Sequence, residues 1–441
     1  MSATEADTPG IPLHLGPGES GTEPSSPMLL ADPVGYFTSG FRKHGPVFRT
    51  RFRGTDWTTI AGIEANDFFW QNTSDWSYEA AGAGFRSQFG PTYVTQLDGV
   101  PHLRKRRLLK AAFSAEAVGS LVRGMALEAG RFLADIRSWS ADSNVWVPAL
   151  LLSMNKETLL KTELTRTQML DAIQLEGELI YGVAVSANPH SFFGRPEYVR
   201  LKAGVFEWLD KILRKRLEGA KADDNLQALI DQDPGNLEPL SREELLNDAY
   251  MLLVAGIHNT AKLLTRIIER ISHDPDWVSE LRAEVAGSTA ESFTRGVGKY
   301  PKLRATILEG ERLHPGGTFL RRRPIKDLPF AGLTIPADRP VMQAHTLPHF
   351  LPEYYHDPLV FNPRRWLEGE PPQRKALADF GGGAHICLGM NISRIQIPII
   401  LAELLRSYDW RLDYNPKFWL TVDPGDGLHE LHEPIWVLRR G

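Results

Sequence analysis

The feature that most constrains this chain is its single cysteine, Cys387, which lies in the glycine-rich stretch FGGGAHICLG. One thiol among 441 residues excludes an internal disulfide, which is typical of proteins in a reducing compartment. An apolar helical pattern follows Gly389, so we expect Cys387 at or near the start of a helix. The dipole and free N–H groups of a helix start favour a thiolate, which is a strong ligand for iron.

Most of the chain between residues 111 and 307 shows the apolar spacing of amphipathic helices. Breaks fall in the segments SANPHSFFGRPEY and DQDPGNLEPLS. After the second break, Ser241 and Glu244 form a capping box, and the apolar pattern continues to the triplet HDP. A helix of about 30 residues would be about 45 Å long, so we expect it to cross the centre of the domain.

Strands are predicted only in short segments. The segment GPVFRTRFRGTDWTTIAG alternates around Gly54 and is rich in β-branched and aromatic residues, which indicates a hairpin. After about Gly317, loops and prolines dominate until a last helix over MNISRIQIPIILAELLRSY. The predicted fold class is mainly α with a small β part, in a single domain over residues 27–441. Residues 1–26 are rich in Pro, Gly, Ser and acidic residues, so we expect a disordered tail.

Composition argues against several classes of function. A net charge of −4 and a pI near 6.4 give no reason to expect binding to nucleic acid. The N-terminus lacks the basic and apolar regions of a signal peptide, and no apolar run reaches the ~18 residues of a membrane span. We expect a cytoplasmic protein without a membrane span, and a monomer.

The ten residues from Phe380 to Gly389 fit the pattern F-x-x-G-x-H/R-x-C-x-G throughout, and they resemble the haem-ligand loop of cytochromes P450. The resemblance implies the cytochrome P450 fold, haem b as cofactor, Cys387 as the iron ligand, and cofactor contacts from Phe380 and Gly389. It covers essentially the whole chain after the tail, with some likeness to the sterol demethylase branch. The alternative is a buried structural cysteine in a glycine-rich turn.

The family also carries an E-x-x-R pair on a helix and an arginine in a later F-x-P-x-R-F/W stretch. Here ILEGERLHP supplies Glu309 and Arg312, and FNPRRW supplies Arg365. By resemblance these three residues form a buried ion network that braces the haem loop. An isolated E-x-x-R pair is usually a solvated surface ion pair, but the order and spacing relative to Cys387 favour the network.

Haem propionates need cations or strong hydrogen-bond donors. The resemblance assigns this role to His102 and Arg106 in the segment PHLRKRRLL, and to His385. It also assigns one arginine of FLRRRPIKDL, where the spacing selects Arg322 and leaves Arg321 as a rival. Each basic residue alone would more often be a surface charge, and the match of the whole set favours the propionate role.

The long central helix departs from the family pattern A-G-x-D/E-T-T/S. Ala255 and Gly256 keep the first two positions, at which the family contacts its cofactor. An ungapped alignment then places His258 at the acid and Asn259 at the catalytic threonine, with Thr260 on the second hydroxyl position. A gap of one residue would instead place Thr260 on the catalytic position.

Two functional readings follow for these three catalytic candidates. The first is a monooxygenase that inserts one oxygen atom from dioxygen into a lipophilic molecule, such as a terpenoid, sterol, polyketide or aromatic compound. Protons would then arrive through His258, through water held by Asn259 and Thr260, or through a substrate hydroxyl. The second is a haem-thiolate isomerase, dehydratase or peroxide-using enzyme that needs no dioxygen activation. A haem sensor or carrier is a third class, and a cap on a local helix distortion is the structural alternative for Asn259.

A monooxygenase of this kind takes electrons from outside, and the chain has neither spare cysteines nor a G-x-G-x-x-G segment after a strand. A separate ferredoxin or flavodoxin is therefore implied. Arg104, Lys105, Arg107 and Lys110 offer an acidic partner a docking face, or else form a solvated face.

An apolar substrate pocket is expected from three parts of the chain: the loop SYEAAGAGFRSQFGPTYVTQ, the helices at about 170–215, and the central helix from Met251 to Thr260. Within the loop, Phe85, Phe89 and Tyr93 suggest an apolar guest.

Overall fold

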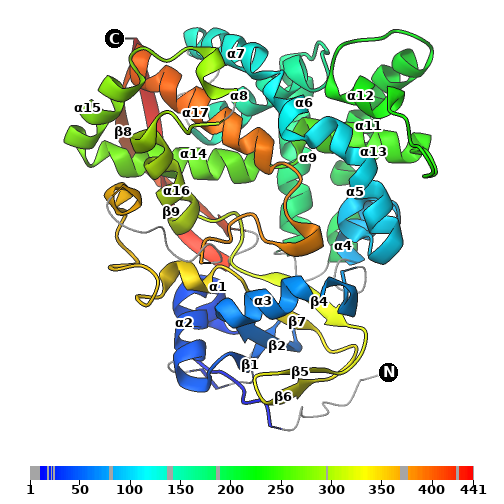
Figure 1. Cartoon of the computed structure of the whole chain (residues 1–441), viewed down its shortest axis with the longest axis vertical. Coiled ribbons are helices and arrows are strands. Elements are labelled where there is room, and N and C mark those ends of the chain that lie inside the picture. Colours follow the sequence, from blue (N-terminus) through cyan, green and yellow to red (C-terminus); the bar gives the residue numbers. More distant parts are fainter. Residues whose placement is uncertain are drawn as a thin grey trace.

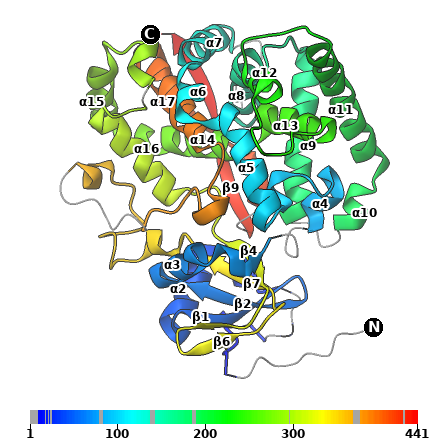
Figure 2. The same cartoon turned by 45° about the vertical axis from the view of Figure 1, so that its right-hand side comes forward.

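The computed structural model describes residues 10–16, 19–20, 22, 25–78, 83–136, 143–184, 189–294, 296–367, 376–423 and 427–440. A part rich in helices lies above a smaller part that contains the main sheet (Figures 1 and 2). The predicted fold class, mainly α with a small β part, is confirmed. Among the described residues, no helix combines the length and the apolar character that crossing a membrane requires.

The smaller part is built on a five-stranded sheet in the order β1-β2-β7-β4-β3, with a separate hairpin of β5 and β6. β1 and β2 pair antiparallel around Gly54, which confirms the predicted hairpin, while β2 and β7 are parallel. The elements of this part are α1 (Pro27–Ala31), α2 (Pro33–His44), β1 (Val47–Phe52), β2 (Thr55–Ala61), α3 (Ile63–Gln71), β3 (Trp76–Ser77), β4 (Leu320–Pro324), β5 (Leu328–Phe330), β6 (Leu333–Ile335) and β7 (Val341–Ala344).

The larger part packs its helices around one extended apolar core. The last helix, α17, confirms the prediction for that segment, and a long hairpin of β8 and β9 follows it and runs toward α1 (Figure 1). Its elements are α4 (Ala83–Phe89), α5 (Gly99–Phe113), α6 (Ala115–Gly119), α7 (Val122–Ala134), α8 (Ser143–Thr158), α9 (Arg166–Ala184), α10 (Pro189–Phe193), α11 (Pro196–Leu217), α12 (Asn225–Asp231), α13 (Arg242–Val254), α14 (Ile257–Ser272), α15 (Pro275–Val285), α16 (Pro301–Leu313), α17 (Met390–Ser407), β8 (Tyr408–Asp423) and β9 (Gly427–Arg440).

Part of the segment that we expected to be a loose tail packs against the sheet. Ile11 is buried, and the N–H of His14 donates to the carbonyl of Arg49 at 2.9 Å. The N–H of Arg49 in turn donates to the carbonyl of Pro12 at 2.7 Å. β1 is the outer strand of the sheet, so its free edge offers these groups to the N-terminal segment. Residues 1–9 lie outside the described residues, and the tail stays a prediction there.

The central helix is not continuous, and the prediction of one helix of about 30 residues was wrong. The capping box at Ser241 and Glu244 is present, but α13 ends at Val254. Ala255 is extended, with ψ at 125°, and Gly256 has a left-handed φ of 87° before α14 begins. Glycine adopts this conformation at little cost, so the break falls where the sequence tolerates it.

A pair of buried amide side chains holds this break. The carbonyl of Leu253, close to the end of α13, accepts a hydrogen bond from Asn155 Nδ2 at 2.8 Å. Asn155 Oδ1 accepts from Gln396 Nε2 at 2.8 Å, and both side chains are buried. A helix end leaves its last carbonyls without intrahelical donors. Asn155 from α8 therefore replaces a donor that the interrupted helix does not supply, and Gln396 from α17 orients it.

We predict that Asn155→Leu lowers the free energy of unfolding by about 1–3 kcal/mol, because the Leu253 carbonyl would then be buried without a donor. Denaturant unfolding followed by circular dichroism measures the change. Gln174→Leu, on the exposed face of α9, is the matched control and should shift stability by less than about 0.5 kcal/mol. Equal stability of the two variants would contradict the role of Asn155.

Candidate active site

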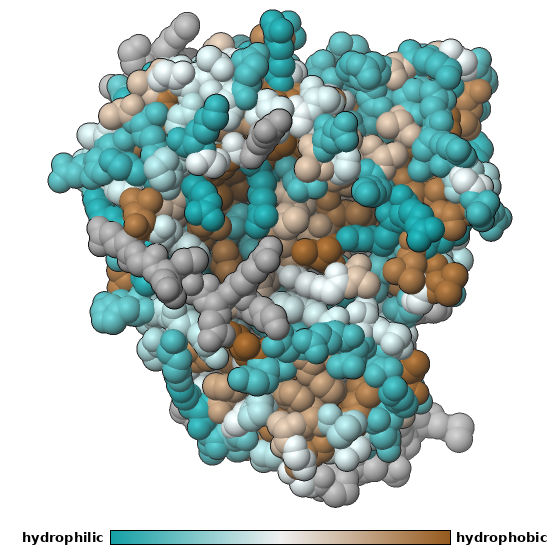
Figure 3. Space-filling model, in the orientation of Figure 1, coloured by the Kyte–Doolittle hydropathy of each residue, from teal (hydrophilic) through white to brown (hydrophobic). Residues whose placement is uncertain are grey.

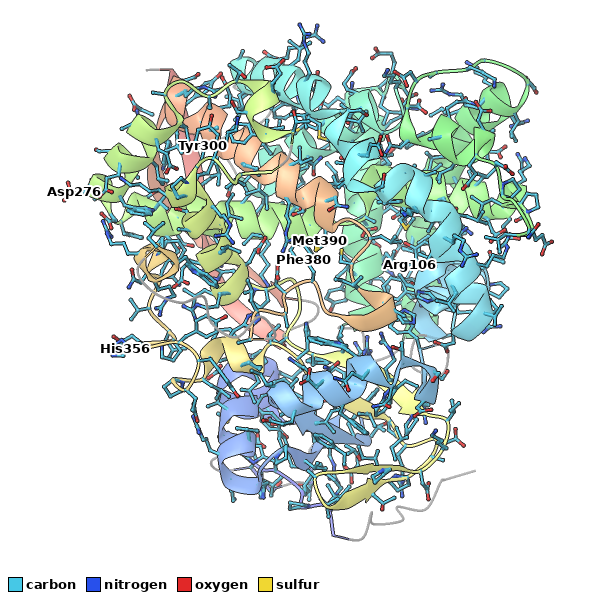
Figure 4. All side chains as sticks on the ribbon, viewed as in Figure 1. Arg106, Asp276, Tyr300, His356, Phe380 and Met390 are labelled. Atoms are coloured by element: carbon cyan, nitrogen blue, oxygen red, sulfur yellow. The ribbon has the colours of Figure 1, made fainter. Side chains whose placement is uncertain are left out.

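Residues from both parts of the fold line a cavity of about 490 Å³. Its walls come from α5 and α8, from the junction of α13 and α14, from β4, and from residues 379–389. Figure 4 places the labelled Arg106, Phe380 and Met390 near the middle of the molecule. On the surface, hydrophobic residues gather near the middle of the same face, between hydrophilic ones (Figure 3). The cavity thus lies where segments far apart in the sequence meet.

Cys387 lines this cavity and lies three residues before α17 begins at Met390. Its N–H donates to the carbonyl of Phe380 at 3.0 Å, which closes the loop between them. Burial raises the pKa of the Cys387 thiol, while the N–H groups of Gly389 and Met390 act on it in the opposite direction. The backbone donors thus offset part of the effect of burial, and the pKa of the thiol stays above its ordinary value.

The glycines of this loop are required by its own packing. Gly381 and Gly383 have left-handed φ values of 68° and 65°. A Cβ on Gly382 would lie 2.4 Å from the indole Cδ2 of Trp70, so no larger residue fits at that position. Trp70 of α3 thus clamps the loop from one side. The sequence analysis missed Trp70, because a tryptophan near the end of a short helix carries no specific signal.

Three of the predicted propionate donors lie together beside the loop. Arg106 Nη1 donates to the carbonyl of Ile386 at 2.7 Å, next to Cys387. The rings of His102 and His385 stack with their centroids 3.8 Å apart. Burial and the neighbouring cations lower the pKa of His102 to about 4 and that of His385 to about 3. Both imidazoles are therefore neutral at pH 7, although Asp98 Oδ1 lies 3.9 Å from His385 Nε2.

Strand β4 separates the two rival arginines. Arg322 lines the cavity, is buried, and places its guanidinium 4.0 Å from the ring centroid of Tyr78. Burial lowers the pKa of Arg322 to about 10. Arg321 is not among the described residues of the cavity lining, since successive side chains of a strand point to opposite faces. The structure thus brings Arg322, and not Arg321, together with the other basic residues.

Glu309 lies at the centre of a buried ion network. Arg312 binds its carboxylate with two hydrogen bonds of 2.8 and 2.9 Å, and Arg365 Nε lies 3.0 Å from the same group. Trp366 Nε1 and the N–H of Asn362 donate to it at 2.9 and 2.8 Å. Glu309 and Arg312 are fully buried, with 0% of each side chain exposed. The three predicted residues therefore meet, and the resulting charge pairing keeps the pKa of Glu309 below its ordinary value despite burial.

His349 connects this network to the cysteine loop. Its Nδ1 donates to the carbonyl of Arg312 at 2.9 Å, and its Nε2 accepts from the N–H of Ala378 at 2.8 Å. Burial lowers the pKa of His349 to about 3, which favours the neutral ring that this pair of bonds requires. His349 was not predicted from the sequence, where LPHF shows no pattern around it.

Of the residues predicted to contact the cofactor or to act in catalysis from the central helix, most line the cavity and one does not. Ala255, Gly256, Asn259 and Thr260 line the cavity. The Asn259 side chain is exposed there, and in the described part of the chain no hydrogen bond is made by its amide. Asn259 therefore does not cap the break beside Gly256. Thr260 is buried, and its N–H donates to the carbonyl of Gly256 at 2.8 Å.

His258 lies elsewhere than the alignment led us to expect. Its Nε2 donates to the carbonyl of Ile173 on α9 at 3.1 Å, and the described lining of the cavity does not include it. Burial lowers the pKa of His258, so the ring is neutral at pH 7. Because α14 starts anew at Ile257, His258 is turned toward α9 and joins these two helices. A proton relay through this side chain has no support in the geometry.

The chain matches the sequence profile described as "Cytochrome P450" over residues 30–425. The chain belongs to the cytochrome P450 family. It is 24% identical to abscisic acid 8'-hydroxylase 3 of Oryza sativa subsp. indica, over 87% of this chain and 78% of that one. It is 25% identical to lanosterol 14-alpha demethylase of Bos taurus, over 92% of this chain and 84% of that one.

Among solved structures, the retinoic acid-bound cyanobacterial CYP120A1 superposes on this chain with a TM-score of 0.81 at 22% identity. The superposition covers 98% of this chain and 100% of that one. The predicted family and fold are confirmed, and the protein is a cytochrome P450 monooxygenase with haem b as its cofactor.

The lining of this P450 fits haem b in charge and in polarity. Arg322 is buried and Arg106 is half-buried, and neither forms an ion pair with a carboxylate of the described residues. Unpaired buried cations are costly, so an anion such as a propionate would relieve them. Cys387 supplies a soft ligand for iron, and most of the remaining wall is apolar.

The expected substrate pocket of the P450 is lined only in part by the segments that we predicted. Tyr93, Met251 and Thr260 line the cavity, but Phe85, Phe89 and the described residues of 166–217 do not. Phe89 instead packs in the core, where it stacks on Tyr93 with centroids 4.4 Å apart. Residues 79–82 of the predicted loop lie outside the described residues.

Fewer of the cations on α5 are exposed than we expected from the sequence. Lys105 is fully buried and lies 2.7 Å from Asp248, and Arg104 lies 2.9 Å from Glu244. These two cations join α5 to α13 and are not available to a partner. Arg107 and Lys110 are exposed, next to the exposed apolar side chains of Val100 and Leu103.

We predict that Glu309→Ala lowers the free energy of unfolding by about 3–5 kcal/mol, because Arg312 would be left as an unpaired buried charge. The matched control, Glu207→Ala, removes the partner of Lys211 in an exposed pair and should cost less than about 1 kcal/mol. Denaturant unfolding of both variants gives the comparison. Similar losses in the two would contradict a bracing role for the buried network.

Proposed function

We propose that this P450 inserts one oxygen atom of dioxygen into a lipophilic small molecule, with electrons from a separate ferredoxin or flavodoxin. The observation that carries this proposal is that the Cys387 thiol lines a largely apolar cavity whose wall also includes Asn259 and Thr260, beside the break between α13 and α14. When bound, the haem supplies activation of dioxygen and transfer of one oxygen atom to the substrate.

Each part of the cavity wall has a proposed role in holding the cofactor. Cys387 would be the iron ligand, with the N–H groups of Gly389 and Met390 as hydrogen-bond donors to its sulfur. The basic residues would bind the propionates, and the small or aromatic residues would contact the ring. These residues are His102, Arg106, Arg322 and His385 for the propionates, and Ala255, Gly256, Phe380 and Gly389 for the ring.

A terpenoid or a sterol is the substrate class that the comparisons support best. One relative named above is a hydroxylase of abscisic acid, and the other is a demethylase of lanosterol. Leu151, Leu159, Leu263 and Ile257 contribute apolar side chains to the cavity. A guest of this kind would be held mainly by the burial of its apolar surface.

The exposed residues of α5 are the proposed docking surface for the redox partner. Arg107 and Lys110 present positive charge, and Val100 and Leu103 present apolar area beside it. An acidic ferredoxin or flavodoxin would complement such a surface.

We predict that Cys387→Ala abolishes the carbon monoxide spectrum of a thiolate-ligated haem in the reduced protein, because no other cysteine is present. Ser393→Ala, also in the cavity wall, is the control and should keep that spectrum. A thiolate spectrum retained by Cys387→Ala would rule out this residue as the ligand.

The distal residues distinguish dioxygen chemistry from its alternative. Asn259 has no hydroxyl proton to pass on, which favours either water held between Asn259 and Thr260 or a reaction that needs no dioxygen. In the first case, ordered water at these two side chains delivers protons to the reacting oxygen.

We predict that Asn259→Thr raises the fraction of consumed NAD(P)H that appears as product, with unchanged haem content. The measurement is coupled turnover with a ferredoxin system and dioxygen, on a compound found by a spectral binding screen. An unchanged fraction would indicate that Thr260, and not Asn259, takes the position of the catalytic threonine. The variant Thr260→Val then tests this assignment. Equal turnover by the unmodified enzyme without dioxygen, when a hydroperoxide is supplied, would favour the isomerase-type alternative.

A further inference from the structure

One imidazole lies in the cavity wall where α16 ends beside the distal residues. His314 follows the last residue of α16, and it lines the cavity together with Pro315 and Gly316. A Cβ on Gly316 would lie 3.4 Å from Cγ of Asn259. The chain that follows α16 is therefore in contact with α14, on the side of α14 that carries a distal residue.

The end of α16 packs on α14 through the face that carries His314. Gly310 precedes His314 by one helical turn, and its carbonyl accepts from the N–H of His314 at 2.8 Å. A Cβ on Gly310 would lie 2.4 Å from Cγ1 of Ile267 and 3.2 Å from Cδ1 of Leu263, which itself lines the cavity. Residues one turn apart share a helix face, so His314 lies where α16 meets both α14 and the cavity.

Arg270 determines which ring nitrogen of His314 carries the hydrogen. Arg270 lies on the exposed side of α14, and its Nε donates to His314 Nε2 at 3.4 Å. A guanidinium has only donors, so the nitrogen that faces it must be the acceptor. In the neutral imidazole the hydrogen is then on the other nitrogen, Nδ1.

The surroundings of His314 keep the ring neutral. Burial lowers its pKa well below the ordinary value, and four cations act in the same direction. These cations are Arg266, Arg270, Lys262 and Arg312. A protonated ring would face repulsion from all of them, and so would a positively charged group of a ligand. His314 therefore offers a neutral N–H donor at pH 7.

The donor on Nδ1 has no partner within the described residues. No hydrogen bond of this nitrogen is found there, and the atom keeps accessible surface. Leu263 and Pro315, which flank this part of the wall, are apolar. A donor in an apolar cavity favours a guest that brings an acceptor, since it is otherwise left unpaired when water is displaced.

We propose that His314 donates a hydrogen bond from Nδ1 to an acceptor oxygen of the substrate, such as a carbonyl, ether or hydroxyl oxygen. The proposal rests on the proposed function and narrows its substrate class to lipophilic molecules that carry such an oxygen at the end that lies between α14 and α16. His314 would orient the substrate and determine specificity. It takes no part in the chemical step.

Equilibrium dialysis of the haem-loaded enzyme tests this binding independently of turnover. The probes are three ketones, each paired with its hydrocarbon: nootkatone with valencene, camphor with camphane, and cyclododecanone with cyclododecane. A ketone is better hydrated than its hydrocarbon, so the informative quantity is the change in their affinity ratio between two proteins. For at least one pair, we expect His314→Phe to weaken ketone binding by about 10-fold and to leave hydrocarbon binding within about 3-fold, as the loss of one hydrogen bond implies.

Two further variants separate the hydrogen bond from a loss of folding. His273→Phe makes the same change at an exposed position directly after α14, and it should leave the ratio unchanged for every pair. His314→Gln keeps an N–H donor and an acceptor for Arg270, and it should restore the ratio to within about 3-fold of the unmodified enzyme.

A ratio that His314→Phe leaves unchanged for all three pairs would overturn the proposal, and so would the absence of ketone binding to the unmodified enzyme. A failure of the proposed function gives a different result. Ketones would still bind with the expected dependence on His314, while neither ketones nor hydrocarbons would be oxidised with dioxygen and reduced ferredoxin.

Discussion

The buried carboxylate of Glu309 is the constraint on which the rest of the site depends. A carboxylate without access to water must be neutralised where it lies, and Arg312 and Arg365 do this from α16 and from a later loop. The two segments are therefore fixed to each other by charge and not by local sequence. Through His349 the same cluster reaches Ala378, two residues before Phe380. A loop with four glycines among its ten residues has few side chains to pack, so contacts with other segments fix its position.

Three contacts impose that position from different directions. Trp70 covers Gly382, Arg106 binds the carbonyl of Ile386, and His349 holds the backbone at Ala378. Each contact comes from another part of the chain, so the loop is held only after the whole fold has assembled. This arrangement explains how Cys387 can lie in a segment with few side chains and still be fixed.

The parts of this structure that could be predicted are those with a local cause. The hairpin around Gly54 and the helix after Gly389 follow from alternation and periodicity, and the cysteine loop follows from its fixed spacing. The break at Gly256 could not be predicted, because the apolar pattern continues in phase on both sides of it. The side chain that satisfies its free carbonyl is Asn155, 98 residues earlier in the chain. Trp70 and His349 were missed for the same reason, since each acts on a segment remote in sequence. The direction of the His258 side chain was missed because an alignment gives the position of a residue in the sequence. It does not show how a break in the helix changes the direction in which that side chain points.

The amide pair at that break has a consequence for how the two faces of the cavity communicate. Gln396 donates to Asn155, and Asn155 donates to Leu253, so each hydrogen bond polarises the next in one direction. The series begins on α17, which starts three residues after Cys387, and ends near the last residue of α13, just before the break that precedes α14 and its distal residues. A ligand that binds more tightly when α13 and α14 form one continuous helix must therefore offset the loss of these amide hydrogen bonds with its binding energy. Loss of these bonds would also weaken the contact of Asn155 with Gln396 on α17. Ligand binding beside α14 and the packing of the helix that follows Cys387 are therefore thermodynamically linked.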